Sequence, residues 1–285
     1  MKREDFRLRH RLRVRWVEVD MQKIVFNGHY LMYFDTAMGD YWRALALPYE
    51  QTMHQLGGDL YVKKASVEYH GSARYDDQLE VCLRCARIGT SSMQFVGGIF
   101  CGDRLLITGE LIYVYANPAT QTSLPVPDPL RQIVDGYEAG QRVTEVRVGT
   151  WQDLRALAQP VRTEVFVQEQ GIDQRLEWDD LDETAVHAVL CNRLGMALGT
   201  ARLLQPQPGV GQIGRMAVSR LMRGSGLGAQ LLHTLIDASR ARGDHRVQLH
   251  AQRSAEGFYA RLGFTCEGEP FEEAGIPHIQ MARTL

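Results

Sequence analysis

The sequence lacks any long apolar run, and none of its stretches approaches the roughly 20 residues that a membrane-spanning helix needs. Its N-terminal stretch, MKREDFRLRHRLRVRW, contains no apolar core of the kind found in secretory signals. The same stretch carries Glu4 and Asp5 and no serine, which argues against a transit peptide. We therefore expect a cytoplasmic protein that does not insert into a membrane.

Cysteine is scarce and odd in number, with 5 in 285 residues, so a disulfide framework is not expected. Cys82 and Cys85 form a C-x-x-C pair within a stretch that alternates like a β-strand. Residues three apart on a strand face opposite sides, so these two thiols cannot share a metal. No second pair completes a zinc site, and we predict no metal centre and a structural role for these cysteines.

Charge of one sign is also missing, because 32 Lys and Arg against 34 Asp and Glu leave a formal charge of −2. No global field therefore draws the protein to nucleic acid or to a membrane surface. Arginines at every second position from Arg7 to Arg15 predict a strand with one basic face. We favour a solvated surface for that face; the alternative is a landing strip for the phosphates of a nucleotide ligand.

What is present is ordinary globular composition, with 45% apolar and 23% charged residues in a length that suits two domains. Four prolines between Pro118 and Pro129 interrupt the pattern, and we place the boundary between about residues 130 and 143. The expected domains are 1–135 and 143–285.

The first half shows one helical stretch, with apolar residues at helical spacing from Leu31 to Leu45. Four strand-like runs follow it, at 60–70, 79–88, 91–101 and 104–116. One long helix followed by a run of antiparallel strands predicts an α+β domain with the helix against the sheet.

The second half alternates strands and helices and predicts an α/β domain with a mixed sheet. Its most specific signal is Arg223-Gly-Ser-Gly-Leu-Gly228, which follows a strand and opens a helix. Such a turn can aim several backbone N–H groups at one point, and its glycines let the backbone approach a pyrophosphate. It contains no Gly-Lys-Ser/Thr and no G-x-G-x-x-G, so neither a nucleotide-triphosphatase loop nor a dinucleotide fingerprint is present.

This loop, with Met216-Ala-Val218 before it and Phe258-Tyr259-Ala-Arg-Leu-Gly-Phe264 after it, resembles the GCN5-related N-acetyltransferases, or GNAT family. The resemblance covers residues 143–285 and implies acetyl-CoA as co-substrate, with no tightly bound cofactor. It implies that the backbone at Met216 and Val218 pairs with pantetheine, and that Tyr259 is the general acid for the departing thiolate. It also assigns the pyrophosphate to the loop, that is, to Arg223, Gly224, Ser225, Gly226, Leu227 and Gly228.

The attacking amine needs a base or must arrive neutral. The candidates on the acceptor side are Glu169, His187, His250 and His278, although each of them taken alone is more often a structural or surface residue than a base. The sequence does not choose between them.

In the first half, Asp20 lies in a loop just before the helix, where the helix dipole favours a carboxylate. Backbone N–H groups there could polarise a carbonyl while the carboxylate attacks it or activates water. The alternative interpretation is that Asp20 simply caps the helix.

The segment VRWVEVDMQKIVFNGHYLMYFDTA resembles the opening of hotdog-fold acyl-CoA thioesterases of the 4-hydroxybenzoyl-CoA thioesterase type. The resemblance covers about residues 8–135. It implies that Asp20 is catalytic, that the backbone N–H at Asn27 polarises the thioester, and that the domain forms a homo-oligomer. The chain departs from the family with Met21-Gln22-Lys23 after the aspartate, where the family has small residues or glycine.

These observations predict a bifunctional CoA-thioester enzyme, with acyl-CoA hydrolysis in the first domain and acetyl transfer to an unidentified amine in the second. One alternative is an acetyltransferase alone, with the hotdog domain as a dimerising or acyl-CoA-sensing module. Another is a nucleic-acid-binding regulator that uses the face between Arg7 and Arg15, which the near-neutral charge disfavours.

Overall fold

The computed structural model describes all 285 residues, which fold into two compact units, Met1–Val143 and Thr144–Leu285. No helix in either unit is long and apolar enough to cross a lipid bilayer. All five cysteines are free thiols, and no group of three or more His, Cys, Asp or Glu side chains could hold a metal ion.

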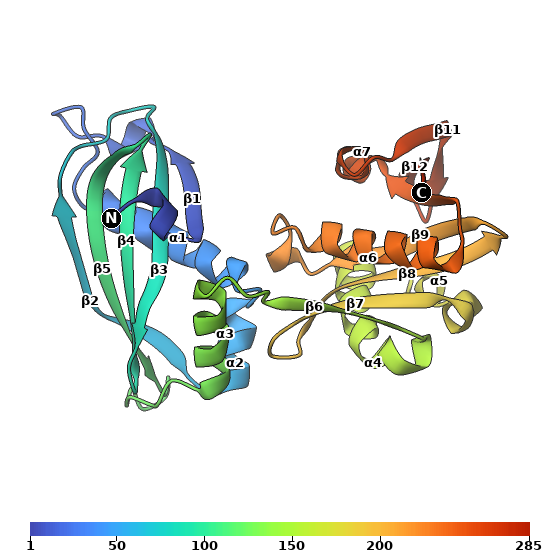
Figure 1. Cartoon of the computed structure of the whole chain (residues 1–285), viewed down its shortest axis with the longest axis horizontal. Coiled ribbons are helices and arrows are strands. Elements are labelled where there is room, and N and C mark those ends of the chain that lie inside the picture. The colour runs from blue at the N-terminus through green and yellow to red at the C-terminus, as the bar shows by residue number, and fades with distance from the viewer. The chain divides into compact units, whose positions relative to one another are not determined.

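The first unit contains a five-stranded antiparallel sheet in the order β1-β3-β4-β5-β2. Helix α1 lies along one face of this sheet (Figure 1). The predicted α+β fold, with one long helix against an antiparallel sheet, is confirmed. The elements are β1 (Leu8–Arg13), α1 (His29–Ala44), α2 (Tyr49–Leu56), β2 (Asp59–Tyr69), β3 (Gln78–Ile88), β4 (Ser92–Cys101), β5 (Arg104–Ala116) and α3 (Asp128–Glu138).

Two glycines of the sheet make room for helix α1. Gly97 on β4 and Gly109 on β5 pair with each other across the sheet, and the ring of Phe34 from α1 is fully buried against them. A β-carbon on either glycine would lie 2.5 Å from that ring, which is closer than carbon atoms can approach. The helix can therefore sit close to the sheet only because both side chains are missing.

Helix α3 belongs to the first unit. The hydroxyl of Tyr41 on α1 donates a hydrogen bond to Glu138 at 2.5 Å, and the Arg7 guanidinium lies 4.2 Å from the centre of the Tyr137 ring. The expected end of the first domain at residue 135 therefore lies inside α3, and the compact unit continues to Val143.

The second unit contains a seven-stranded mixed sheet in the order β11-β12-β10-β9-β8-β7-β6, in which only β9 and β10 run parallel. Helices α4 and α6 cover opposite faces of this sheet (Figure 1), and the predicted α/β domain with a mixed sheet is confirmed. The strands are β6 (Thr144–Gly149), β7 (Val186–Asn192), β8 (Ala197–Gln207), β9 (Val210–Val218), β10 (Arg246–Gln252), β11 (Thr265–Glu273) and β12 (Ile276–Thr284). The helices are α4 (Trp151–Arg162), α5 (Gln174–Glu177), α6 (Leu227–Arg242) and α7 (Glu256–Arg261).

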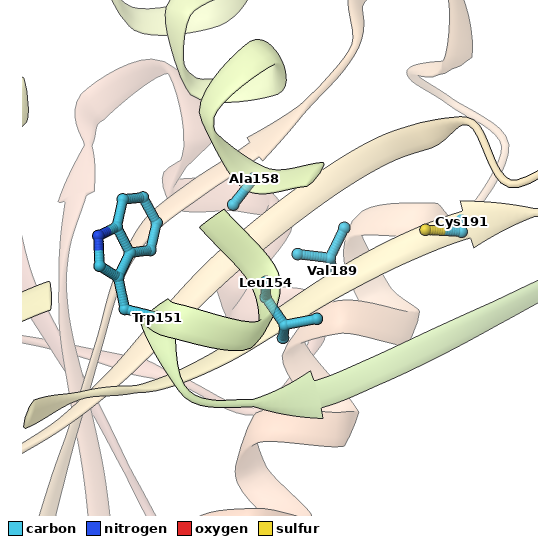
Figure 2. Close-up of a cluster of buried hydrophobic side chains, with 5 residues drawn as sticks. All are labelled: Trp151, Leu154, Ala158, Val189 and Cys191. Atoms are coloured by element: carbon cyan, nitrogen blue, oxygen red, sulfur yellow. The ribbon is translucent and has the colours of Figure 1, made fainter. Parts of the chain in front are cut away.

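Helix α4 packs through a small apolar cluster onto strand β7. Figure 2 shows Trp151, Leu154 and Ala158 of the helix gathered around Val189 and Cys191 of the strand, and all five are buried. Thr150 begins the helix with a capping box, in which its hydroxyl accepts from the Asp153 N–H. A π-helical segment, η3 (Thr163–Glu169), continues α4, and such segments are frequent at functional sites.

Candidate functional sites

The parallel pair of β9 and β10 is incomplete. The two strands are paired from Val210 with Arg246 to Ile213 with Leu249, and no further pairs follow although both strands continue. Strand β9 bulges directly after this point, at Arg215, whose φ of 49° lies in the left-handed region. Beyond Ile213 and Leu249 the two strands are no longer paired, and we call this opening the fork. The last residues of β9 have one backbone edge that faces the fork. Met216 and Val218, the expected pantetheine partners, lie on this edge.

The glycine-rich loop leads from the fork into helix α6. Gly224 and Gly226 have φ values of 84° and 83°, which a residue with a side chain adopts only at a cost. Gly226 occupies the N-cap position, and no side chain caps the helix. The first N–H groups of a 16-residue helix are therefore free to bind an anion, and the helix dipole favours one there.

The remaining loop positions shape this helix end. Ser225 donates its hydroxyl hydrogen to the Met222 carbonyl, and Leu227 is buried as the first residue of α6. A β-carbon on Gly228 would lie 3.3 Å from the Phe258 ring, so this glycine lets α6 and α7 pack closely. The loop is therefore held by internal contacts and not by the anion that it could bind.

The side chain of Arg223 binds Glu169 and the end of strand β9. Its guanidinium donates two hydrogen bonds of 2.6 Å to the Glu169 carboxylate and a third to the Val218 carbonyl at 3.0 Å. The hydrogen bonds from Arg223 hold the pKa of Glu169 below its usual range. A carboxylate stabilised as the anion is a weaker base, so Glu169 is better suited to anchor the loop than to accept a proton.

Tyr259 lies on α7, with its hydroxyl 3.6 Å from the Met216 sulfur. Burial raises the pKa of this phenol to about 12. The hydroxyl therefore carries its proton at neutral pH, as a general acid must.

His187 is buried among charged side chains. Its Nε2 donates to the Asp182 carbonyl at 2.9 Å, its ring centre lies 4.9 Å from that of Trp151, and burial lowers its pKa. Around it, Arg162 donates to Glu177 and to Asp182, and these side chains are almost completely buried. His187 is thus a part of the core beneath helix α4, where the Trp151 ring packs against its imidazole ring.

His250 and His278 lie near one another on neighbouring strands. The His250 Nδ1 is 2.8 Å from a carboxylate oxygen of Glu273, and hydrogen bonding from His250 lowers the pKa of Glu273. His278 donates from Nδ1 to the Ile276 carbonyl at 2.7 Å and is buried, whereas His250 is partly exposed. Phe271 contacts both rings, at 4.9 Å and 6.0 Å between ring centres.

In the first unit, Asp20 closes a turn. Its backbone N–H donates to Ile24 at 2.9 Å, and its carboxylate accepts the Gln22 N–H at 2.8 Å. The N-cap of helix α1 is Gly28, and no side chain caps the helix. The interpretation of Asp20 as a helix cap is therefore wrong, because the loop turns back on itself before the helix begins.

Asn27 immediately precedes that uncapped N-cap. Its backbone N–H makes no hydrogen bond within the chain, and its carbonyl accepts from the Tyr69 hydroxyl at 3.3 Å. The bridge between Val19 and Val25 closes the base of the turn, and the Phe26 N–H bonds to the Glu18 carbonyl at 2.9 Å. Asp20 and a free N–H at the start of α1 are thus carried by one short closed loop.

Sequence reasoning gave no role to Glu18, which fixes this loop. Its buried carboxylate accepts hydrogen bonds from the Tyr33 hydroxyl at 2.9 Å and from the Arg15 N–H at 2.6 Å. Burial alone would raise its pKa, but the hydrogen bonds from Arg15 and Tyr33 outweigh burial, and the pKa is lowered. The only signal in the sequence was an acidic residue two positions before Asp20.

The basic face at the start of the chain is largely neutralised. Arg11 pairs with Glu80, Arg13 with Asp76 and Arg15 with Glu18. Most of these arginines are at least partly exposed, and such pairs contribute little to stability. They nevertheless leave less positive charge for a phosphate ligand than the sequence pattern indicates.

Comparisons with known proteins match each half separately. The family described as "Acetyltransferase (GNAT) domain" matches residues 154–285, and the "Thioesterase superfamily" matches residues 22–108. Protein ElaA of Escherichia coli is 37% identical over 47% of this chain and 96% of its own length. The uncharacterized N-acetyltransferase YjcF of Bacillus subtilis is 33% identical over 43% of this chain and 87% of its own length. A solved 1,4-dihydroxy-2-naphthoyl-CoA thioesterase from Synechocystis is 18% identical, with a TM-score of 0.42, over 45% of this chain and 95% of its own.

Proposed function

The chain belongs to the GNAT acetyltransferases through its second half and carries a thioesterase-superfamily domain in its first half, and from this premise we propose a bifunctional CoA-thioester enzyme. The first domain hydrolyses an acyl-CoA, and the second transfers an acetyl group from acetyl-CoA to an amine. Both halves then handle the same kind of donor and differ in the acceptor.

One observation carries the acetyl-transfer half of this proposal: a fork in the sheet opens beside an uncapped helix N-terminus. The edge of β9 at Met216 and Val218 is not paired with β10 and offers backbone groups to the amides of pantetheine, although the Val218 carbonyl already accepts one hydrogen bond from Arg223. The N-terminus of α6 at Gly226 offers N–H groups to the pyrophosphate. The two features suit the two chemically different parts of one CoA molecule.

Tyr259 supplies the acid for this reaction. The amine attacks the thioester carbon, the carbon–sulfur bond breaks, and the electron pair leaves on sulfur as a thiolate. The protonated Tyr259 hydroxyl lies beside Met216 at the fork between β9 and β10. From there it can give its proton to the CoA thiolate.

Asp20 and Asn27 support the hydrolytic half. The free Asn27 N–H at the start of α1 can polarise a thioester carbonyl, with the helix dipole behind it. Asp20, held on the same loop, can attack that carbonyl or activate a water molecule. The position of Asp20 supports direct attack by its carboxylate and activation of water equally.

We also propose that the first domain assembles into a homo-oligomer. Strand β2 is an edge of the sheet, its residues are mostly exposed, and it runs for 11 residues. The same unit exposes several large apolar side chains, including Trp16 at 75% and Met21 at 100%. Both the unpaired edge and the apolar surface would be covered by a second copy.

A panel of acyl-CoA thioesters, each assayed with and without amines, tests the proposal. We expect free thiol to appear without amine for at least one acyl chain, and acetyl transfer to appear with at least one amine. Transfer without hydrolysis of any thioester would support the alternative in which the first domain only dimerises or senses acyl-CoA. Hydrolysis and transfer both absent would refute the proposal.

A further inference from the structure

The proposed acetyl transfer still lacks a group that takes the proton from the amine, and the fork indicates where such a group must lie. Leu249 is the last residue of β10 that pairs with β9, so His250 stands at the mouth of the fork. On its other side, β10 remains paired with β12 as far as Gln252. Beyond Leu249, β10 is therefore unpaired only on the side that faces β9. The thioester would lie in the gap between these two strands.

His250 and Tyr259 lie on opposite faces of the sheet. Ala217 packs with Val165 and Phe166 of η3, so its neighbour Met216, which contacts Tyr259, points to the other face. On β10, the Gln252 side chain bonds to Gln170, directly after η3, at 3.0 Å. His250 shares that face, because residues two apart on a strand point the same way.

Glu273 gives the imidazole the orientation that a base requires. A carboxylate accepts a hydrogen bond, so the 2.8 Å contact places the ring proton of neutral His250 on Nδ1. Nε2 then carries the lone pair, and it forms no hydrogen bond within the chain. The Phe271 ring, 4.9 Å away, supports the imidazole from the side.

The other candidates are engaged elsewhere. Arg223 holds Glu169 as an anion through two hydrogen bonds. His187 is buried under helix α4, and His278 is buried and bound to a backbone carbonyl. His250 alone combines a carboxylate partner, a free nitrogen and an exposed position at the fork.

We propose that His250, oriented by Glu273, is the general base of the acetyl transfer; this rests on the proposed function of the second domain. The amine nitrogen forms a bond to the thioester carbon, and the proton of the resulting adduct passes to His250 Nε2. The carbon–sulfur bond then breaks, and the thiolate takes the proton of Tyr259. The imidazolium and the phenolate return to their starting states by exchanging one proton through water.

Chemical rescue tests this assignment on the full chain. Putrescine, tryptamine and lysine serve as amine probes, and acetyl-CoA affinity is measured separately by calorimetry. We expect His250→Ala to lower acetyl transfer by about 10²–10⁴, and added imidazole to restore part of the rate. We expect Glu273→Gln to cause a smaller loss, because it keeps the ring in place but weakens the preference for the Nδ1 proton. Acetyl-CoA affinity should stay unchanged in both variants.

His233→Ala is the matched control, because His233 is exposed on α6, and it should keep the full rate with or without imidazole. If the unaltered chain acetylates the probes and His250→Ala is as fast, the base assignment is overturned and the proposed function stands. A slow His250→Ala variant that binds acetyl-CoA normally but does not respond to imidazole would assign a structural role to His250. If the unaltered chain acetylates none of the probes, the proposed acetyl transfer to such amines fails, and the base assignment fails with it.

Discussion

At the scale of single residues, the carboxylate of Asp20 has two roles. It accepts the Gln22 N–H within its turn, and it is the proposed nucleophile or base of the hydrolysis. Asp20→Asn keeps an oxygen that can accept the Gln22 N–H but removes the negative charge. We expect it to abolish thioester hydrolysis and to leave acetyl transfer intact, as measured by release of free thiol with and without amine. Asp35→Asn, at an exposed position of α1, should be neutral for both reactions. Hydrolysis by Asp20→Asn at the parent rate would reduce Asp20 to a turn residue.

The role of Tyr259 as the general acid can be tested by removing only its hydroxyl group. Tyr259→Phe keeps the buried ring but removes the hydroxyl, and we expect acetyl transfer to fall by about 10²–10⁴. Acetyl-CoA affinity, measured by calorimetry, should change little. A phenol with a pKa of about 12 stays almost fully protonated at pH values well below 12, so its ionisation should cause no loss of activity between pH 7 and about 10. A Phe variant with the full rate would mean that the thiolate leaves unaided or takes its proton from water.

Local motifs decided which site residues the sequence could indicate. Tyr259 and the loop from Arg223 to Gly228 are contiguous patterns with a chemical reason for each residue type. Glu273 is 23 positions from His250, and only the antiparallel pairing through β12 brings the two together. The pairing of Arg223 with Glu169 across 54 positions was invisible for the same reason.

At the scale of elements, the contact between α1 and its sheet depends on two missing side chains. Gly97→Ala would press a methyl group against Phe34 and the Cys82 carbonyl, and we expect it to destabilise the fold by about 1–3 kcal/mol. Chemical denaturation of the full chain measures this loss. Gly39→Ala is the control, because it adds a methyl group to α1 with no close contact and should stabilise by about 0.5–1 kcal/mol. Equal effects of the two changes would show that the space around Phe34 is not limiting.

Patterning located the long elements but missed helix α2 and the irregular segments. The helical spacing from Leu31 to Leu45 and the four strand runs correspond to α1 and β2–β5. Helix α1 and strands β3–β5 bury many of their apolar residues, whereas β2 is recognised by its length and strand-like composition although its residues are mostly exposed. Helix α2 buries only two of its eight residues, so its sequence carries no strong period. The π-helical turn η3 and the bulge at Arg215 are local departures from regular backbone that only tertiary packing selects.

At the scale of the whole molecule, the division into two units predicts that each works without the other. Cutting the chain after Val143 should give an N-terminal fragment that is dimeric or larger and a C-terminal fragment that still binds acetyl-CoA. The loop, the fork and Tyr259 all come from the second fragment. Light scattering on the first fragment and calorimetry on the second measure both results. A monomeric first fragment would contradict the proposed homo-oligomer.

Length and composition predicted two domains, and the proline-rich stretch placed their boundary between about residues 130 and 143, a range that ends where the first compact unit ends. The proline-rich stretch indicated a linker, yet α3 follows it and packs back through Glu138 and Tyr137. Proline interrupts regular structure without saying whether the next helix belongs to the preceding core.

The fork between β9 and β10 also limits how thick a ligand can be near the point where the strands are joined. Paired strands are about 4.8 Å apart, and these two stay joined from Val210 to Ile213, so the gap starts from that narrow spacing. We expect a thin arm with amide groups to enter such a gap more readily than a polypeptide strand, which carries side chains on both faces. The unpaired edge of β9 would then accept slender ligands and would not be extended by a strand of a neighbouring protein.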